Sequence, residues 1–271
     1  MNILDEIIAS KRREIEAPGY FQALETVVEN LPHIGTECTA CDGKSARQPV
    51  PDFIVALKAT TVGLIAEVKR KSPSAGPIRE PFDPAAIARA YEASGAQAIS
   101  CLMDAKYFGG GEEQWNAVRA ATGLPMLYKE FVIDPRQIFH AEALGASAVL
   151  LIVAVLGDAE LKKYIRLTTA SGMTPLVEVH TEEEMKRAVA AGAECIGINN
   201  RNLKTFETKL ETTLQLRKLA PKNCTLISES GIRAAADVKM LRDAGITAIL
   251  VGESLLRQPD IETAVRALMQ G

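Results

Sequence analysis

Residues 174–199, TPLVEVHTEEEMKRAVAAGAECIGIN, contain one complete strand–helix–strand unit. Residues 174–179 are short, apolar and rich in β-branched side chains, as expected for a parallel strand that is covered on both faces. Residues 181–184, Thr-Glu-Glu-Glu, place acidic side chains in the first turn of a helix, where the helix dipole favours them. Gly192 is a typical left-handed end to that helix, and a second buried strand begins at Cys195.

The same alternation recurs through most of the chain. The predicted strands are Val62–Val68, Ala98–Met103, Pro125–Glu130, Ala148–Val153, Thr174–Val179, Cys195–Asn199, Cys224–Ser228 and Ala248–Gly252. Helical patterns lie between them, among them Pro84–Ser94, Pro135–Leu144, Thr181–Ala191 and Ala234–Ala244. Strict alternation of strand and helix indicates a parallel sheet. Eight units in about 210 residues predict an α/β protein with a closed (β/α)8 (TIM) barrel, and a doubly wound sheet is the alternative.

The beginning of the chain does not follow this repeat. Asn2–Glu16 is predicted to form an amphipathic helix, and Asp52–Ala59 a second short helix just before the first strand. We therefore expect residues 1–60 to be a helical N-terminal extension packed on the barrel. Residues 61–271 would form the catalytic barrel, so that the whole chain is a single domain.

Composition and charge exclude several classes of protein. The 31 Lys and Arg residues are balanced by 34 Asp and Glu, and only 5% of residues are aromatic, so a nucleic-acid-coating protein is disfavoured. The longest apolar run, Ala148–Leu156, is too short to span a bilayer, and the charged N-terminus is unlike a signal peptide. The five cysteines have no framework spacing, which is typical of reduced thiols in a cytoplasmic protein.

Charged and polar side chains gather at the carboxyl ends of the predicted strands, where barrel enzymes place their active sites. Glu67 and Lys69 are two residues apart and therefore share a face of the first strand. The ends of other strands carry Lys129, Glu178, Asn199 and Glu229. Burying such charges is costly unless they pair, so a catalytic mouth is the favoured interpretation and a solvated rim of salt bridges the alternative.

Small residues follow the last two strands. Ser230-Gly231-Ile232 and Val251-Gly252-Glu253-Ser254 resemble the loops with which barrels bind phosphate, and Glu253–Arg257 is predicted to form the short extra helix that accompanies them. Ser72 lies on the neighbouring loop of the first strand. These residues indicate an enzyme acting on a small phosphorylated anion, although the glycines alone would also fit ordinary turns.

No metal or cofactor is expected from the residue pattern. The three histidines are scattered, and His180 is expected at the rim of the site rather than in it. Gly109-Gly110-Gly111 lacks the spacing of a dinucleotide fingerprint. Cys38 and Cys41 form a single CxxC motif without a second pair, and we interpret it as part of a loop without metal or redox function rather than as a zinc site or a redox pair.

The motifs at successive strand ends resemble the indole-3-glycerol phosphate synthase family of tryptophan biosynthesis. They are Ile65-Ala66-Glu67-Val68-Lys69-Arg70-Lys71-Ser72-Pro73-Ser74, Lys106-Tyr107-Phe108, Tyr128-Lys129-Glu130-Phe131, Leu176-Val177-Glu178-Val179-His180, Ile198-Asn199-Asn200-Arg201-Asn202-Leu203, Ser228-Glu229-Ser230-Gly231-Ile232 and Val251-Gly252-Glu253-Ser254. The resemblance implies a decarboxylating lyase. Its reaction closes the ring of 1-(2-carboxyphenylamino)-1-deoxyribulose 5-phosphate, with loss of CO2 and water, to give indole-3-glycerol phosphate.

The resemblance also implies a role for each matching residue. Lys129 would be the general acid, Glu178 would take part in proton removal and dehydration, and Lys69 would pair with the anthranilate carboxylate. Glu67 and Asn199 would support these groups by hydrogen bonds, and Ser230 would lie near the substrate hydroxyls. The remaining expected binding residues fall into three groups: Ser72, Gly231, Gly252 and Glu253 at the phosphate, Phe108, Phe131 and Leu203 around the aromatic ring, and Arg201 as a further cation near the substrate's anionic groups.

Physical chemistry allows these roles. A lysine that donates a proton near neutral pH would have its pKa lowered by burial and neighbouring positive charge, and a carboxyl group in the same pocket would have its pKa raised. The loop Arg70–Ile78 has a composition suited to a lid. The expected partner is the phosphorylated aromatic substrate. We also expect a monomer that makes contact, at most, with other enzymes of the pathway.

Two related functions remain as alternatives. Phosphoribosylanthranilate isomerase, another phosphate-binding barrel, normally uses a Cys/Asp pair, which the set of Glu67, Lys69 and Lys129 argues against. A barrel that only binds a phosphorylated ligand would not need that charged set.

Overall fold

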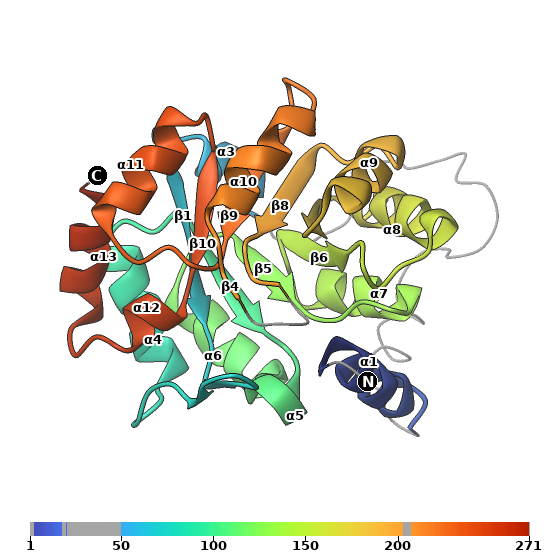
Figure 1. Cartoon of the computed structure of the whole chain (residues 1–271). Coiled ribbons are helices and arrows are strands. Elements are labelled where there is room, and N and C mark those ends of the chain that lie inside the picture. The colour runs from blue at the N-terminus through green and yellow to red at the C-terminus, as the bar shows by residue number, and fades with distance from the viewer. Residues whose placement is uncertain (1–2, 18–19, 21–49, 203–206, 271) are drawn as a thin grey trace.

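Eight parallel strands close into a barrel in the computed structural model, which describes residues 3–17, 20, 50–202 and 207–270. The strands are β1 Gly63–Val68, β4 Ala98–Leu102, β5 Met126–Lys129, β6 Ala148–Ile152, β7 Thr174–Val179, β8 Cys195–Asn199, β9 Thr225–Glu229 and β10 Ala248–Val251. Because β1 pairs with both β4 and β10, the sheet has no edge, and the predicted barrel is confirmed over a doubly wound sheet (Figure 1). A short antiparallel hairpin of β2 (Lys71–Ser72) and β3 (Gly76–Pro77), which the sequence did not predict, follows β1.

Helices follow the strands and surround the barrel (Figure 1). They are α1 Ile3–Ile15, α3 Phe53–Leu57, α4 Pro84–Ala93, α5 Ala105–Phe108, α6 Glu112–Ala121, α7 Pro135–Ala143, α8 Asp158–Ala170, α9 Glu182–Ala190, α10 Glu211–Leu216, α11 Ala235–Asp243, α12 Glu253–Leu256 and α13 Ile261–Met269. Asp83 and Asp134 cap the starts of α4 and α7 by accepting main-chain hydrogen bonds, as their position before proline predicts. The predicted extra helix after β10 is present as α12.

The apolar side chains form two layers because strand residues alternate between the two faces. One layer lies between the strands and the outer helices and includes Val68 and Val177. The other fills the inside of the barrel and includes Ile65, Leu127 and Leu176. The barrel interior is therefore a packed apolar core below the charged strand ends, so polar chemistry is confined to one mouth.

The two N-terminal helices lie at opposite ends of the barrel. Phe53 and Leu57 of α3 pack into the inner layer and close the amino-terminal end of the strands. The α1 helix lies at the other end, beside α5 and α7 (Figure 1), where its Lys11 contacts Asp104 and Glu130. The proposed division of the chain into an extension and a barrel at residue 60 stays a prediction.

Candidate active site

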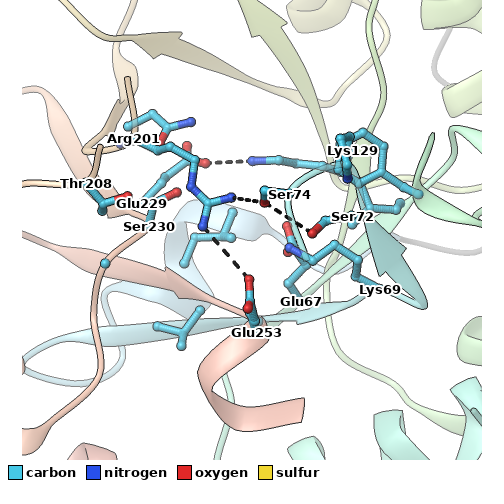
Figure 2. Close-up of a pocket in the computed structure, with 18 of the residues that line it drawn as sticks. Glu67, Lys69, Ser72, Ser74, Lys129, Arg201, Thr208, Glu229, Ser230 and Glu253 are labelled. Carbon is cyan, nitrogen blue, oxygen red and sulfur yellow. Dashed lines mark hydrogen bonds and ion pairs between the residues drawn. The ribbon is translucent and has the colours of Figure 1, made fainter. Parts of the chain in front are cut away.

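A cavity of about 590 Å³ opens at the carboxyl ends of the strands. Its volume is in the range of small-molecule sites. The cavity is lined by every described residue of the predicted site: Glu67, Lys69, Ser72, Phe108, Lys129, Phe131, Glu178, Asn199, Arg201, Ser230, Gly231, Gly252 and Glu253. Leu203 lies outside the described residues. Figure 2 shows that the side chains labelled there, among them Lys69, Lys129 and Arg201, come from different sides of the barrel mouth and point into one space.

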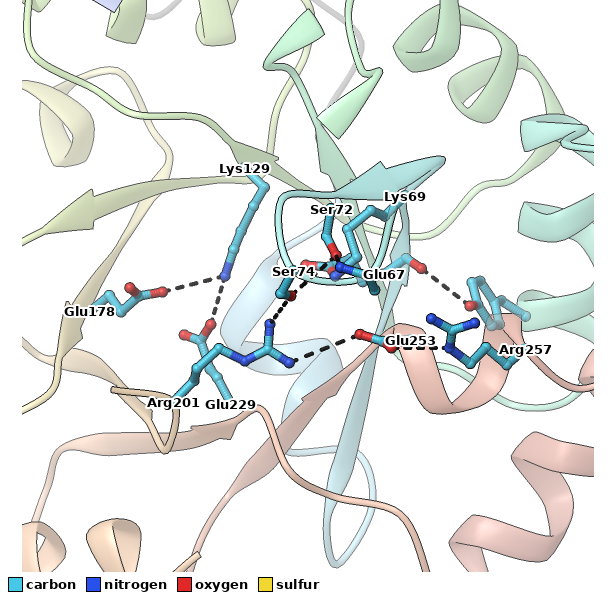
Figure 3. A network of polar contacts seen from close by, with 12 residues as sticks. Glu67, Lys69, Ser72, Ser74, Lys129, Glu178, Arg201, Glu229, Glu253 and Arg257 are labelled. Carbon is cyan, nitrogen blue, oxygen red and sulfur yellow. Dashed lines mark hydrogen bonds and ion pairs between the residues drawn. The ribbon is translucent and has the colours of Figure 1, made fainter. Parts of the chain in front are cut away.

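Two lysines form the centre of the charged network (Figure 3). Lys69 Nζ lies 2.5 Å from Glu67 Oε1. Lys129 Nζ lies 2.6 Å from Glu229 Oε2 and 3.5 Å from Glu178 Oε2. Both lysines lie at the floor of the cavity, with side chains only 12% and 13% exposed. Each ammonium group is thus held by at least one carboxylate inside the cavity.

The pKa values of the carboxyl groups in this network are shifted in different directions. Burial by itself would raise the pKa of every one of them. The ammonium groups of Lys69 and Lys129 outweigh that effect at Glu67, and Lys129 with His180 outweighs it at Glu178, so both pKa values are lowered. At Glu229, burial and the neighbouring Glu178 outweigh Lys129, and the pKa is raised.

The expectation of a catalytic lysine with a lowered pKa is wrong for Lys129. Burial alone would lower its pKa, but the carboxylates of Glu229, Glu178 and Glu67 raise it well above the ordinary value. The expectation of a carboxyl group with a raised pKa, which named no residue, is met at Glu229 and not at Glu178. The protein therefore holds Lys129 as a stable cation between one ionised carboxylate and one carboxyl group that binds a proton readily.

Glu229 was placed at a strand end by the sequence, but it was given no role in the predicted site. The predicted strand ended at Ser228, directly before Glu229, whereas β9 continues through Glu229. Its side chain is 2% exposed, and Oε1 has no hydrogen-bond partner among the described residues. A Cβ atom on Gly197 of the neighbouring strand would collide with that oxygen, so the glycine makes room for the carboxyl group.

His180 does not line the cavity, in agreement with the rim position that the sequence predicted, but it contacts the carboxylate of Glu178. Its Nε2 is 3.3 Å from Glu178 Oε1, and its Nδ1 is 3.1 Å from Glu184 Oε2. Burial alone would lower the pKa of His180, but these two carboxylates raise it to about 10. The imidazolium thus stands behind Glu178, on the side of that carboxylate opposite its contact with Lys129.

Small residues form the other end of the cavity. Ser230 and Gly231 follow β9 with positive φ angles of 67° and 83°, a left-handed turn that a glycine adopts without strain. Gly252 precedes α12, and a Cβ atom there would lie 2.7 Å from Glu67 Oε1. Arg201 reaches across this end, with Nη1 3.3 Å from Ser74 Oγ and Nη2 3.9 Å from Glu253 Oε2 (Figure 2).

Apolar side chains form the wall near α1. The rings of Phe108 and Phe131 are 6.0 Å apart and tilted by 37°. Ile3, Leu4 and Ile7 of α1 line the cavity as well. The sequence placed Ile3 and Ile7 on one face of a helix, but it did not show that this face reaches the site. The cavity is therefore charged at its floor, small and polar at one end, and apolar at the other.

The described part of the chain holds no group of three or more His, Cys, Asp or Glu side chains arranged to bind a metal ion. The CxxC of Cys38 and Cys41 lies outside the described residues. No helix in residues 3–17, 50–202 and 207–270 has the length and apolar character needed to cross a membrane.

Comparison with known proteins places this chain in a family. The family model for indole-3-glycerol phosphate synthase matches residues 4–268. The chain belongs to this family. Among curated members, the indole-3-glycerol phosphate synthase of Carboxydothermus hydrogenoformans is 48% identical over 209 residues, which cover 77% of this chain and 79% of that protein. The indole-3-glycerol phosphate synthase of Microcystis aeruginosa is 41% identical over 99% of this chain and 89% of its own length.

Solved structures of more distant proteins share the fold. The N-acetylmannosamine-6-phosphate 2-epimerase from Clostridium perfringens has a TM-score of 0.61 at 17% identity, over 79% of this chain and 95% of its own. A 3-hexulose-6-phosphate synthase has the same TM-score at 13% identity, over 77% and 99%. At these identities the likeness supports the barrel alone.

Proposed function

We propose that this protein is an indole-3-glycerol phosphate synthase, a carboxy-lyase that closes the ring of 1-(2-carboxyphenylamino)-1-deoxyribulose 5-phosphate with loss of CO2 and water. The family match and the two curated relatives support this function. The observation that carries the assignment of the site is the position of Lys129 between Glu178 and Glu229, beside the pair of Lys69 and Glu67. The pathway and the free thiols of Cys101, Cys195 and Cys224 support a cytoplasmic location.

The two ends of the cavity fit the two ends of the substrate. The phosphate would bind the main-chain N–H groups around Gly231 and Gly252, with Ser72 beside them. The aromatic ring would lie between Phe108 and Phe131. This orientation brings the anthranilate carboxylate to Lys69 and the ketone to Lys129, with Glu67 and Asn199 orienting these groups by hydrogen bonds. Ser230 would contact the substrate hydroxyls, and Arg201 would close over the phosphate end.

The first half of the reaction forms the carbon–carbon bond. The ring carbon that bears the carboxylate attacks the ketone carbon, and Lys129 gives its proton to the ketone oxygen. A cationic lysine held by carboxylates stabilises the charge that develops on this oxygen, which is the main task of a preorganised site. The carboxylate then leaves as CO2, and its electron pair restores the aromatic ring.

The second half removes water. Glu178, whose pKa is lowered, accepts the proton from the carbon next to the ring nitrogen. The former ketone oxygen leaves as water after a proton is donated to it, a step that we assign to Lys69. The carboxyl group of Glu229, whose pKa is raised, lies within reach of Lys129 and is suited to restore its proton.

A single-turnover experiment can separate these roles by recording CO2 release and indole fluorescence in parallel. We expect Lys129→Met to slow both signals by about 10²–10⁴-fold, as loss of a general acid does. Glu178→Gln should slow indole formation while CO2 release stays near the wild-type rate. Equal slowing of both signals in Glu178→Gln would contradict the assignment of Glu178 to dehydration, and absence of both signals in the wild type would contradict the function.

A further inference from the structure

Lys11 of α1 is a buried cation outside the catalytic network. Its side chain is 0% exposed and lies within ion-pair distance of three carboxylates: Glu14 Oε2 at 2.8 Å, Glu130 Oε2 at 3.0 Å and Asp104 Oδ2 at 3.3 Å. Burying a lysine is unfavourable unless such partners compensate it. The contacts join a helix at the start of the chain to the carboxyl ends of β4 and β5, so the cluster fixes α1 over the mouth of the barrel.

The two barrel carboxylates each use their second oxygen to hold main chain beside an aromatic residue of the site. Asp104 Oδ1 accepts a hydrogen bond of 2.6 Å from the Tyr107 N–H and caps α5, which ends at Phe108. Glu130 Oε1 accepts a hydrogen bond of 2.7 Å from the Phe131 N–H. One ammonium group thus orients both carboxylates, and each carboxylate orients the backbone of one wall of the apolar end.

The same helix supplies a third wall of that end. Ile3, Leu4 and Ile7 of α1 line the cavity, and Ile7 lies one turn before Lys11 on the same face of the helix. Ile7 is only 4% exposed. The position of these apolar side chains over the cavity therefore depends on how α1 is attached, and Lys11 is its most deeply buried polar attachment among the described residues.

We propose that Lys11 is a positioning residue for the aromatic half of the substrate: it holds α1, Phe108 and Phe131 in place around the aromatic ring of the substrate. This inference rests on the proposed function, because that function supplies the ring. The phosphate end is built from β9, β10 and α12, whose described residues form no ion pair with Lys11, so the effect of Lys11 is confined to one half of the ligand.

The test compares two probes that each occupy one half of the site. Anthranilate represents the ring and inorganic phosphate the other end, and ligand-observed NMR titration gives a Kd for each. We expect Lys11→Met to raise the Kd of anthranilate and the KM of the substrate by about tenfold or more, which is about 1.4 kcal/mol. The Kd of phosphate should stay at the wild-type value, and Lys11→Arg should restore most of the loss.

Lys106→Met is the matched control, because Lys106 of α5 also reaches α1 but does so at an exposed contact, with Nζ 3.3 Å from Ser10 Oγ. It should leave both Kd values unchanged. If Lys11→Met does not fold, the double variant Lys11→Met/Glu130→Gln removes the charge of one buried carboxylate together with the ammonium group. The amide oxygen introduced at position 130 can still accept the Phe131 N–H. The double variant should show the same selective loss of affinity for anthranilate.

Two results would overturn the inference. One is a folded Lys11→Met or double variant with unchanged affinity for anthranilate. The other is an equal loss for anthranilate and phosphate, since a merely structural role would weaken both ends together. Both probes bind without turnover, so an inactive wild type would contradict the proposed function while leaving this test readable.

Discussion

Replacing Lys129 by Met should destabilise the protein as well as inactivate it. The ammonium group lies 2.6 Å from Glu229 and 3.5 Å from Glu178, and both carboxyl side chains are at most 5% exposed. Removing one partner of a buried ion pair costs about 3–5 kcal/mol, because the remaining charge is left without compensation. We therefore expect the free energy of unfolding at pH 7.5 to fall by about that amount, measured by urea denaturation followed by circular dichroism.

The pH dependence of this loss has a definite sign. The lowered pKa of Glu178 contributes stability that is present above its unfolded pKa of about 4.3 and is lost as pH falls through the folded value. Without Lys129 this contribution disappears, and Glu178 and Glu229 take up protons at higher pH. The difference in the free energy of unfolding between wild type and Lys129→Met should therefore be smaller at pH 5 than at pH 7.5.

A double-mutant cycle and a control complete the test. Adding Glu229→Gln to Lys129→Met should recover about 1–3 kcal/mol, since neighbouring residues couple by such amounts. Lys239→Met breaks an exposed ion pair with Asp243, 2.5 Å away, and should cost less than about 1 kcal/mol. This account of the network would be refuted by a Lys129→Met protein as stable as wild type. It would also be refuted if the difference in the free energy of unfolding between the two proteins increased on acidification.

Two further substitutions test the surroundings of the network. His180→Gln removes the cation beside Glu178, so the pKa of Glu178 should rise and the acid limb of the pH–rate profile should move to higher pH. The control is His140→Gln, since His140 lies on α7 and does not line the cavity, and it should leave the acid limb in place. A limb unmoved by His180→Gln would show that the histidine does not act on Glu178. Gly197→Ala should displace Glu229 and lower kcat by at least about tenfold at unchanged global fold, because the new methyl group would occupy the place of Oε1; full activity would mean that Glu229 is not required where it lies.

The sequence predicted the barrel and most of the residues at the carboxyl ends of its strands because both follow from local patterns. Buried parallel strands are short apolar runs, and the residue after each run must lie at the same end of the barrel. For that reason Glu67, Lys129 and Glu178 could be placed together although they are far apart in the chain. The limits of α9 and β7 agree with the prediction within one residue for the same reason.

Properties that depend on contacts between distant strands were not predictable. The direction of the pKa shift of Lys129 depends on three carboxylates from three other strands, which no spacing along the chain reveals. Glu229 was given no role because its contact with Lys129, 100 residues away in the chain, is not visible in the sequence. Lys11 looked like one of several charges on an amphipathic helix, and only its burial against β4 and β5 distinguishes it.

The most direct test of the central claim is turnover by the purified wild-type protein without added metal or cofactor. Supplied with 1-(2-carboxyphenylamino)-1-deoxyribulose 5-phosphate, it should release CO2 and form the fluorescent indole product in equal amounts. Loss of substrate without CO2 release, or no change in the substrate at all, would contradict the proposed function.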